Sequence, residues 1–166
     1  MLIYHGSNIE IQRPNPFKYS KTRLDFGRGF YTTTSEEQAR KFTKAVLAKN
    51  NGNGVATVNC YEFDLKGFQD LNIKDFSGVT NEWFDYVEKN RRTDFGKIID
   101  YDMVIGPVAD DNVMPTFVLY EQDILLKKEA IRRLKTWVLK DQIVFKSEKS
   151  LEFLTFVSYK EVENNE

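Results

Sequence analysis

The sequence predicts an α+β fold in a single domain that spans residues 1–166. A chain of 166 residues is long enough to bury a core, and a hydrophobic share of 41% excludes an intrinsically disordered protein. Short apolar and β-branched runs are separated by a few amphipathic segments, without a regular repeat of strand, helix and strand. That irregular order favours an α+β architecture over a parallel α/β sheet.

We expect six strands, because six short runs are rich in aromatic, β-branched and other apolar residues. They span residues 2–5, 29–33, 55–64, 101–105, 142–145 and 154–159. The clearest alternation is in the third strand, where Val58, Cys60 and Glu62 share one face. Gly106 and Pro107 are expected to end the fourth strand, because proline cannot donate a hydrogen bond to a sheet.

The first expected helix follows Ser35, which is a typical N-terminal cap with Gln38 three residues later. Ala39, Phe42 and Val46 share one face of this helix, so we expect Phe42 to be buried. The helix should end near residues 50–52, where asparagine and glycine favour a turn. Further helical segments are expected at 80–91, at 116–138 with a break near 126–128, and at 147–150.

Net charge, cysteine content and the absence of long apolar runs indicate which partners and which cellular location to expect. The formal net charge of −1 predicts no general attraction to nucleic acid or membrane. The single cysteine, Cys60, can form no internal disulfide and is expected in the core. The sequence shows no signal peptide and no apolar run long enough for a membrane span, which predicts a cytoplasmic location. No metal site is expected, because Asp110 and Asp111 lack a third ligand nearby.

Two glycine-containing motifs carry the strongest functional signal. The first is Y-H-G-S at residues 4–7, and the second is D-F-G-R-G-F-Y-T at residues 25–32. Glycines separated by one residue permit a close backbone approach or an unusual turn. Phe30 and Tyr31 then point to opposite faces of the strand that follows. A histidine beside glycine, together with a tyrosine after a Gly-x-Gly turn, predicts a site that grips a flat aromatic ligand.

These motifs resemble the first two motifs of ADP-ribosyltransferases of the diphtheria-toxin and poly-ADP-ribose-polymerase type. The whole chain is more closely similar to DUF3990, a bacterial family of uncharacterised domains placed in that superfamily. The closer likeness lies in residues 25–33, 101–111 and 141–151. The resemblance implies a split two-sheet core with flanking helices, and NAD+ as co-substrate.

The resemblance also implies roles for five residues in binding NAD+. His5 would bind the adenosine ribose, the backbone of Gly6 would pair with the nicotinamide carboxamide, and Ser7 would contact a ribose hydroxyl. Tyr31 and Phe42 would stack on the two faces of the nicotinamide ring. They are eleven residues apart, the separation that the resembled enzymes use.

The third motif of the resembled superfamily contains a glutamate that binds the nicotinamide ribose and stabilises an oxocarbenium-like transition state. The segment D-Q-I-V-F at residues 141–145 resembles that motif, but it contains no glutamate. Asp141 is shorter than glutamate by one methylene, whereas Gln142 has the reach but no charge. Because side chains alternate along a strand, only one of the two can face the site. Both stay candidates beside His5 and Tyr31, and the longer side chain slightly favours Gln142.

The resemblance implies an NAD-dependent mono-ADP-ribosyltransferase that modifies a protein or a nucleic acid. Because the resembled domains are often encoded beside small partner proteins, it also implies a toxin with an antitoxin partner. The alternative is a catalytically silent NAD-binding or protein-interaction module, which the absent glutamate allows. A tRNA 2′-phosphotransferase is disfavoured, because the net charge of −1 does not suit a strongly basic cleft.

Overall fold

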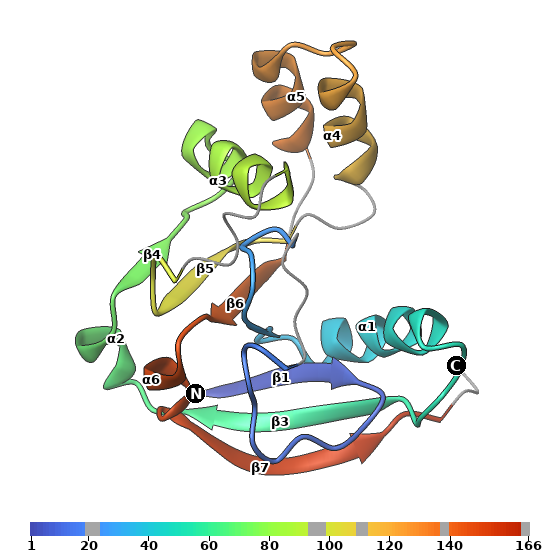
Figure 1. Cartoon of the computed structure of the whole chain (residues 1–166), viewed down its shortest axis with the longest axis vertical. Coiled ribbons are helices and arrows are strands. Elements are labelled where there is room, and N and C mark those ends of the chain that lie inside the picture. Colours follow the sequence, from blue (N-terminus) through green and yellow to red (C-terminus); the bar gives the residue numbers. More distant parts are fainter. Residues whose placement is uncertain (19–23, 93–98, 109–112, 137–139, 164–166) are drawn as a thin grey trace.

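A three-stranded antiparallel sheet forms one side of the fold in the computed structural model (Figure 1). Its order is β1-β3-β7, with β1 at Leu2–Ser7, β3 at Thr57–Phe63 and β7 at Leu154–Glu161. The structure describes residues 1–18, 24–92, 99–108, 113–136 and 140–163. β1 pairs with β3 along its whole length, from Leu2 opposite Glu62 to Ser7 opposite Thr57.

A second sheet of four strands has the order β2-β6-β5-β4. Its strands are β2 at Phe30–Thr32, β6 at Asp141–Phe145, β5 at Met103–Pro107 and β4 at Ile73–Asp75. β4 runs parallel to β5, and the other pairs are antiparallel. One bridge, between Tyr4 and Thr33, connects the two sheets. The expected α+β class and two-sheet core are therefore confirmed.

The helices lie on the outer faces of the two sheets. α1 at Glu36–Lys49 runs across the first sheet, whereas three helices cluster beyond the second sheet (Figure 1). Those three are α3 at Asn81–Arg92, α4 at Met114–Glu121 and α5 at Lys127–Leu134. Two single-turn helices, α2 at Gly67–Asp70 and α6 at Glu148–Leu151, complete the described helices.

Strand β6 separates two hydrophobic clusters. Ile143 and Phe145 contribute to a cluster between the sheets, together with Ile3 and Tyr61 from the first sheet. Val144 points the other way, into a cluster that α3, α4 and α5 build against the second sheet. Successive side chains of a strand alternate in this manner, so Gln142 lies on the same face as Val144. This alternation decides which end residue of β6 can reach the site.

The buried face of α1 differs from the predicted one. Ala39 and Thr43 are buried, whereas the side chain of Phe42 is 51% exposed. A Cβ atom added to Gly6 would lie 2.3 Å from the carbonyl oxygen of Ala39, so the helix backbone packs directly on β1 at this glycine. The prediction that Phe42 is buried is therefore wrong, because the closest approach to Gly6 selects the Ala39–Thr43 face.

Several boundaries also differ from the predicted ones. β5 continues through Pro107, which pairs with Asp141 at the end of the ladder, so Gly106 does not end the strand. The helical segment from residue 116 is two helices, as the expected break indicated, and neither β4 nor α2 was predicted. Asp110 and Asp111, and residues 137–138 at the end of the expected helical segment, lie outside the described residues. Within the described ranges, no helix is long and apolar enough to cross a membrane.

Candidate functional site

A hollow with about 420 Å³ of empty space, part of it open to solvent, lies where the two sheets meet α1. β1 and β2 contribute its floor residues, β6 contributes one end residue, and the first turns of α1 contribute the opposite wall. Four residues that the sequence predicts for one site line this hollow: Gly6, Tyr31, Phe42 and Gln142. The fold therefore brings together residues that are up to 136 positions apart in the sequence.

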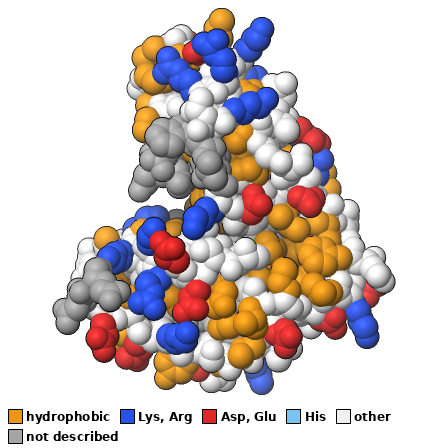
Figure 2. Space-filling view, turned by 180° about the vertical axis from the view of Figure 1, so that it is seen from behind, with side chains coloured by type: hydrophobic (Ala, Val, Ile, Leu, Met, Phe, Trp, Pro, Cys, Tyr) orange, Lys and Arg blue, Asp and Glu red, His pale blue; other side chains and the backbone are white. Residues whose placement is uncertain are grey.

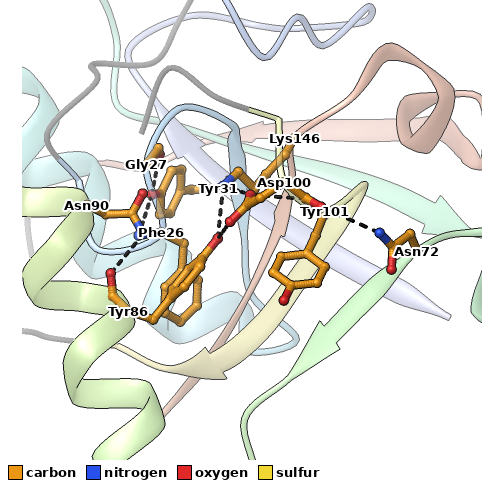
Figure 3. Close-up of polar contacts among 9 residues, drawn as sticks. All are labelled: Phe26, Gly27, Tyr31, Asn72, Tyr86, Asn90, Asp100, Tyr101 and Lys146. Carbon is orange, nitrogen blue, oxygen red and sulfur yellow. Dashed lines mark hydrogen bonds and ion pairs between the residues drawn. The ribbon is translucent and has the colours of Figure 1, made fainter. Parts of the chain in front are cut away.

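Tyr31 lines the hollow, and its hydroxyl group is engaged with the backbone of the preceding loop. The hydroxyl donates to the carbonyl oxygen of Gly27 at 2.6 Å and accepts from the backbone nitrogen of Phe26 at 3.1 Å (Figure 3). Gly27 has a φ of 77°, a conformation that L side chains rarely adopt. Burial, and then the negative charge of Asp25, raise the pKa of Tyr31 well above its ordinary value. The phenol therefore stays protonated and supplies a flat apolar surface.

His5 lies behind the site. Its Nδ1 atom is 2.6 Å from the carbonyl oxygen of Tyr31, and its ring lies tilted against the ring of Phe30, with centroids 4.4 Å apart. A carbonyl oxygen only accepts, so Nδ1 carries the hydrogen and Nε2 of the neutral ring is an acceptor. Burial lowers the pKa of His5 to about 4, although the hydrogen bond to Tyr31 opposes this shift. The histidine is therefore neutral at pH 7 and fixes the backbone of Tyr31.

Ser7 and Asp141, two further predicted site residues, also lie away from the hollow's lining. Ser7 is buried and pairs with Thr57 in the ladder between β1 and β3. Asp141 is exposed at the start of β6, whereas its neighbour Gln142 is only 6% exposed and lines the hollow. Of the two candidates left open by the sequence, the geometry brings Gln142 to the other lining residues.

Gln142 has two acceptors beside its amide nitrogen. Nε2 lies 3.5 Å from Oδ2 of Asp25 and 3.5 Å from the carbonyl oxygen of Pro107. Asp25 is 8% exposed and forms an ion pair with Arg91 of α3. Sequence reasoning did not single out Asp25 or Arg91, because they are 66 residues apart. The only signal was that Asp25 opens the glycine-containing motif.

The start of α1 forms the polar rim of the hollow. Oγ of Ser35 accepts from the backbone nitrogen of Gln38 at 3.2 Å, which confirms the predicted cap. The side chain of Gln38 accepts instead from the hydroxyl of Thr33 at 3.1 Å, and that hydroxyl in turn accepts from the Ser35 nitrogen. Thr33 and Gln38 both line the hollow, although sequence reasoning assigned them no part in the site.

A second buried polar cluster lies at the other end of β6 (Figure 3). Lys146 is 1% exposed, and its Nζ donates to Asp100 at 2.6 Å and to the Tyr86 hydroxyl at 3.0 Å. The Tyr86 hydroxyl donates to the other carboxylate oxygen of Asp100 at 2.7 Å. Burial lowers the pKa of Lys146, and the contacts with Asp100 oppose this. Every member has a partner, so the cluster is a structural anchor and not part of the hollow.

A comparison with known protein families finds a match that covers the whole site. The sequence model described as "Protein of unknown function (DUF3990)" matches residues 1–156. The chain belongs to the DUF3990 family. The match includes every residue that lines the hollow and extends into β7. No curated protein matches the chain.

In this DUF3990 domain, the hollow is lined by three aromatic residues (Tyr4, Tyr31 and Phe42), one buried amide and a close-packed glycine. Such a mixture of apolar walls and a few polar groups is typical of a small-molecule site. The arrangement suits a flat aromatic ring with polar substituents at its edge. Within the described part of the chain, no three histidine, cysteine or acidic residues gather as a metal site would require.

Basic side chains gather at the far end of the domain, where α4 and α5 lie (Figure 2). Lys127, Arg132 and Arg133 of α5 are 37%, 77% and 49% exposed, respectively. Each of the three forms an ion pair, with Asp85 or Glu129. These are solvent-exposed ion pairs of a common kind, and they give no reason to extend the candidate site beyond the hollow.

Proposed function

We propose that this DUF3990 domain is an NAD-dependent mono-ADP-ribosyltransferase. The observation that carries the proposal is that Tyr31, Phe42, Gln142 and Gly6 line one hollow. The residues come from four elements, and an aromatic ring on a strand with a second on a helix is the arrangement that could hold nicotinamide. The finer relationship to ADP-ribosyltransferases rests on the sequence motifs, which supply the expected role of each residue.

The hollow suits the nicotinamide riboside half of NAD+. It combines aromatic walls with a few polar groups, a lining that is typical of small-molecule sites, and part of it is open to solvent. The nicotinamide ring would lie between Tyr31 and Phe42, each stacking contact contributing about 0.5–1.5 kcal/mol beyond burial. The backbone of Gly6 would bind the carboxamide. The adenosine half would extend out of the hollow, where it is open to solvent.

Gln142 is the polar residue that would face the ribose. In the proposed reaction the bond between ribose C1′ and the nicotinamide nitrogen breaks, and its electron pair stays on that nitrogen, which neutralises the pyridinium charge. A nucleophile of the acceptor forms the new bond to C1′ and loses its proton to solvent. Gln142 would accept a hydrogen bond from a ribose hydroxyl and place its carbonyl dipole toward the cationic sugar.

We further propose that the acceptor is a macromolecule, either protein or nucleic acid, and that the enzyme acts as a toxin with a small antitoxin partner. One experiment tests transfer and acceptor class together. The protein is incubated with NAD+ labelled in the adenylate half and a cell lysate, and the products are digested with protease or nuclease. Label that survives nuclease and disappears with protease identifies a protein acceptor, and the reverse identifies a nucleic acid.

Binding is tested with matched aromatic variants. Tyr31→Ala and Phe42→Ala should each weaken NAD+ binding about 2- to 12-fold, the equivalent of one lost stacking contact. Phe68→Ala is the control, because Phe68 is also about half exposed, at 45%, but lies on α2 away from the hollow. Equal affinities in the wild type and in both site variants, measured by calorimetry, contradict the proposal.

The neutral Gln142 supports one alternative, a catalytically silent module that binds NAD+ without cleaving it. A carboxylate stabilises a developing cation more than an amide does, and among the described residues no acidic side chain lines the hollow. Release of free nicotinamide distinguishes the two functions. NAD+ binding that Tyr31→Ala weakens, without nicotinamide release from the wild type in the presence of lysate, establishes the silent module.

A further inference from the structure

A buried carboxylate lies directly behind the polar residue of the hollow. Asp25 is 8% exposed and is not a lining residue, yet its Oδ2 is 3.5 Å from Nε2 of Gln142. Asp25 also forms an ion pair with Arg91, whose side chain is 25% exposed at the edge of α3. A carboxylate is rarely buried unless it is paired, and here Arg91 supplies the opposite charge.

The contacts of Gln142 fix which way its amide points. A carboxylate and a backbone carbonyl are acceptors only, and both lie on the same side of the side chain, beside Nε2. The amide nitrogen carries two hydrogens, one for Asp25 and one for the carbonyl of Pro107. The opposite orientation would place Oε1 against two acceptors, which is repulsive. Gln142 therefore presents its oxygen, an acceptor, to the hollow.

We infer that Asp25 is a positioning residue, which holds the amide of Gln142 so that Oε1 receives a hydroxyl hydrogen of a bound sugar. The inference rests on the proposed function for the identity of the sugar, the ribose of NAD+. Arg91 forms an ion pair with Asp25 and thereby fixes the position of the carboxylate that faces Gln142. The Asp25–Arg91 pair thus holds the amide of Gln142 in one orientation, with Oε1 toward the hollow. A ligand with a hydrogen-bond donor opposite Oε1 would be preferred.

The same geometry explains why an amide and not a carboxylate occupies position 142. A glutamate there would place a second anion beside Asp25, and two like charges at that distance disfavour each other's ionised form. Among the described residues, the charged or titratable groups around the position include Asp25 from the loop before β2, Arg91 from α3, and Tyr31 and Tyr4 from the hollow. Asp141 is exposed on the opposite face of β6.

Unfolding measurements test the inference without any assay of activity. Gln142→Glu should lower the melting temperature by about 4 °C or more at pH 8, and by much less at pH 5, where the new carboxyl can take up a proton. The double variant Asp25→Asn with Gln142→Glu should recover most of the loss at pH 8, because a single carboxylate then remains to pair with Arg91. A loss that is equal at both pH values, or that Asp25→Asn does not relieve, overturns the inference.

Turnover gives the second readout. Asp25→Ala should lower the rate constant of nicotinamide release about ten-fold with little change in the KM for NAD+, whereas Asp25→Asn, which keeps an acceptor, should lower it less. Adding Asp25→Ala to Gln142→Ala should cause no further loss, because Asp25 acts through Gln142. If the double variant loses the product of the two single losses, the two residues act independently and the positioning role is wrong. If the wild type releases no nicotinamide, the proposed function fails, and the pH dependence of unfolding still tests the contact between Asp25 and residue 142 on which the inference is built.

Discussion

The two walls of the hollow are built in different ways. On the sheet side, the Tyr31 hydroxyl contacts Phe26 and Gly27, and the Gln142 amide contacts Asp25 and Pro107. On the helix side, Phe42 is 51% exposed, because α1 packs on β1 through other residues. The sheet wall is therefore preorganised by hydrogen bonds, whereas the helix wall contributes an aromatic surface at little cost to folding. We therefore expect substitutions that disturb the sheet wall to lower the stability of the fold, and the removal of Phe42 from the helix wall to weaken ligand binding with little loss of stability.

The largest effect is expected at Gly6, where the two walls meet. Gly6→Ala would place a Cβ 2.3 Å from the Ala39 carbonyl oxygen, a backbone atom that cannot rotate away. We expect a loss of about 3 kcal/mol in the free energy of unfolding, measured by denaturant titration. Gly52→Ala is the control, because Gly52 has open space but a φ of +76°, and should cost only about 1–2 kcal/mol. A Gly6 variant no worse than this control contradicts direct packing of α1 on β1.

The next effect concerns His5, which holds the backbone of the sheet wall. Its pKa of about 4 in the folded state lies below the unfolded value of 6.5, so the unfolded chain binds the proton more readily. This group therefore lowers stability as the pH falls from about 6.5 to 4, by up to about 3 kcal/mol. His5→Gln should flatten that part of the pH dependence in urea unfolding. Parallel curves for wild type and variant between pH 7 and pH 4 would show that His5 is protonated as easily in the fold.

Tyr31→Phe should affect the sheet wall's stability more than its binding. The substitution leaves the Phe26 nitrogen and the Gly27 carbonyl without their partner, which should cost about 1–2 kcal/mol in unfolding free energy. The ring remains, so NAD+ affinity measured by calorimetry should change less than two-fold. A variant that keeps full stability but loses binding would mean that the hydroxyl group contacts the ligand.

The smallest effect on stability is expected for Phe42→Ala, in contrast to the 3–5 kcal/mol typical of a buried phenylalanine. Because Phe42 is 51% exposed, we expect a loss below about 1 kcal/mol, together with weaker NAD+ binding. Phe145→Ala, at a fully buried position of β6, is the matched comparison for thermal unfolding. Similar losses for both variants would show that the helix wall is part of the core.

Most of the longer helices and strands could be predicted from local sequence patterns, because capping residues and the periodicity of apolar residues indicate where such elements form. The cap at Ser35 and the alternation before Phe63 correctly indicated α1 and β3. β4 was missed because three residues at a sheet edge carry no periodic signal. The extension of β5 through Pro107 was missed because a proline at the end of a ladder needs no donor there, so it does not stop the strand.

The site was predictable only in part, for a different physical reason. The spacing of the motifs correctly predicted that Gly6, Tyr31 and Phe42 lie at one site. The exposure of Phe42 could not be predicted, because it depends on which face of α1 packs against Gly6, and tertiary packing decides that. Likewise, alternation showed that only one of Asp141 and Gln142 faces inward, and the neighbouring clusters decided which. Partners such as Asp25 and Arg91 arise only when distant segments meet.

The buried lysine at the far end of β6 has a consequence for this choice. If β6 slipped by one residue against its neighbours, every side chain would change face, and Asp141 would replace Gln142 in the hollow. Such a slip would also drag Lys146 away from Asp100 and Tyr86 and leave an ammonium group and a carboxylate stranded in an apolar interior. The contacts of Lys146 therefore fix the register of β6 at one end of the strand. That register places Gln142, and not Asp141, in the hollow at the other end.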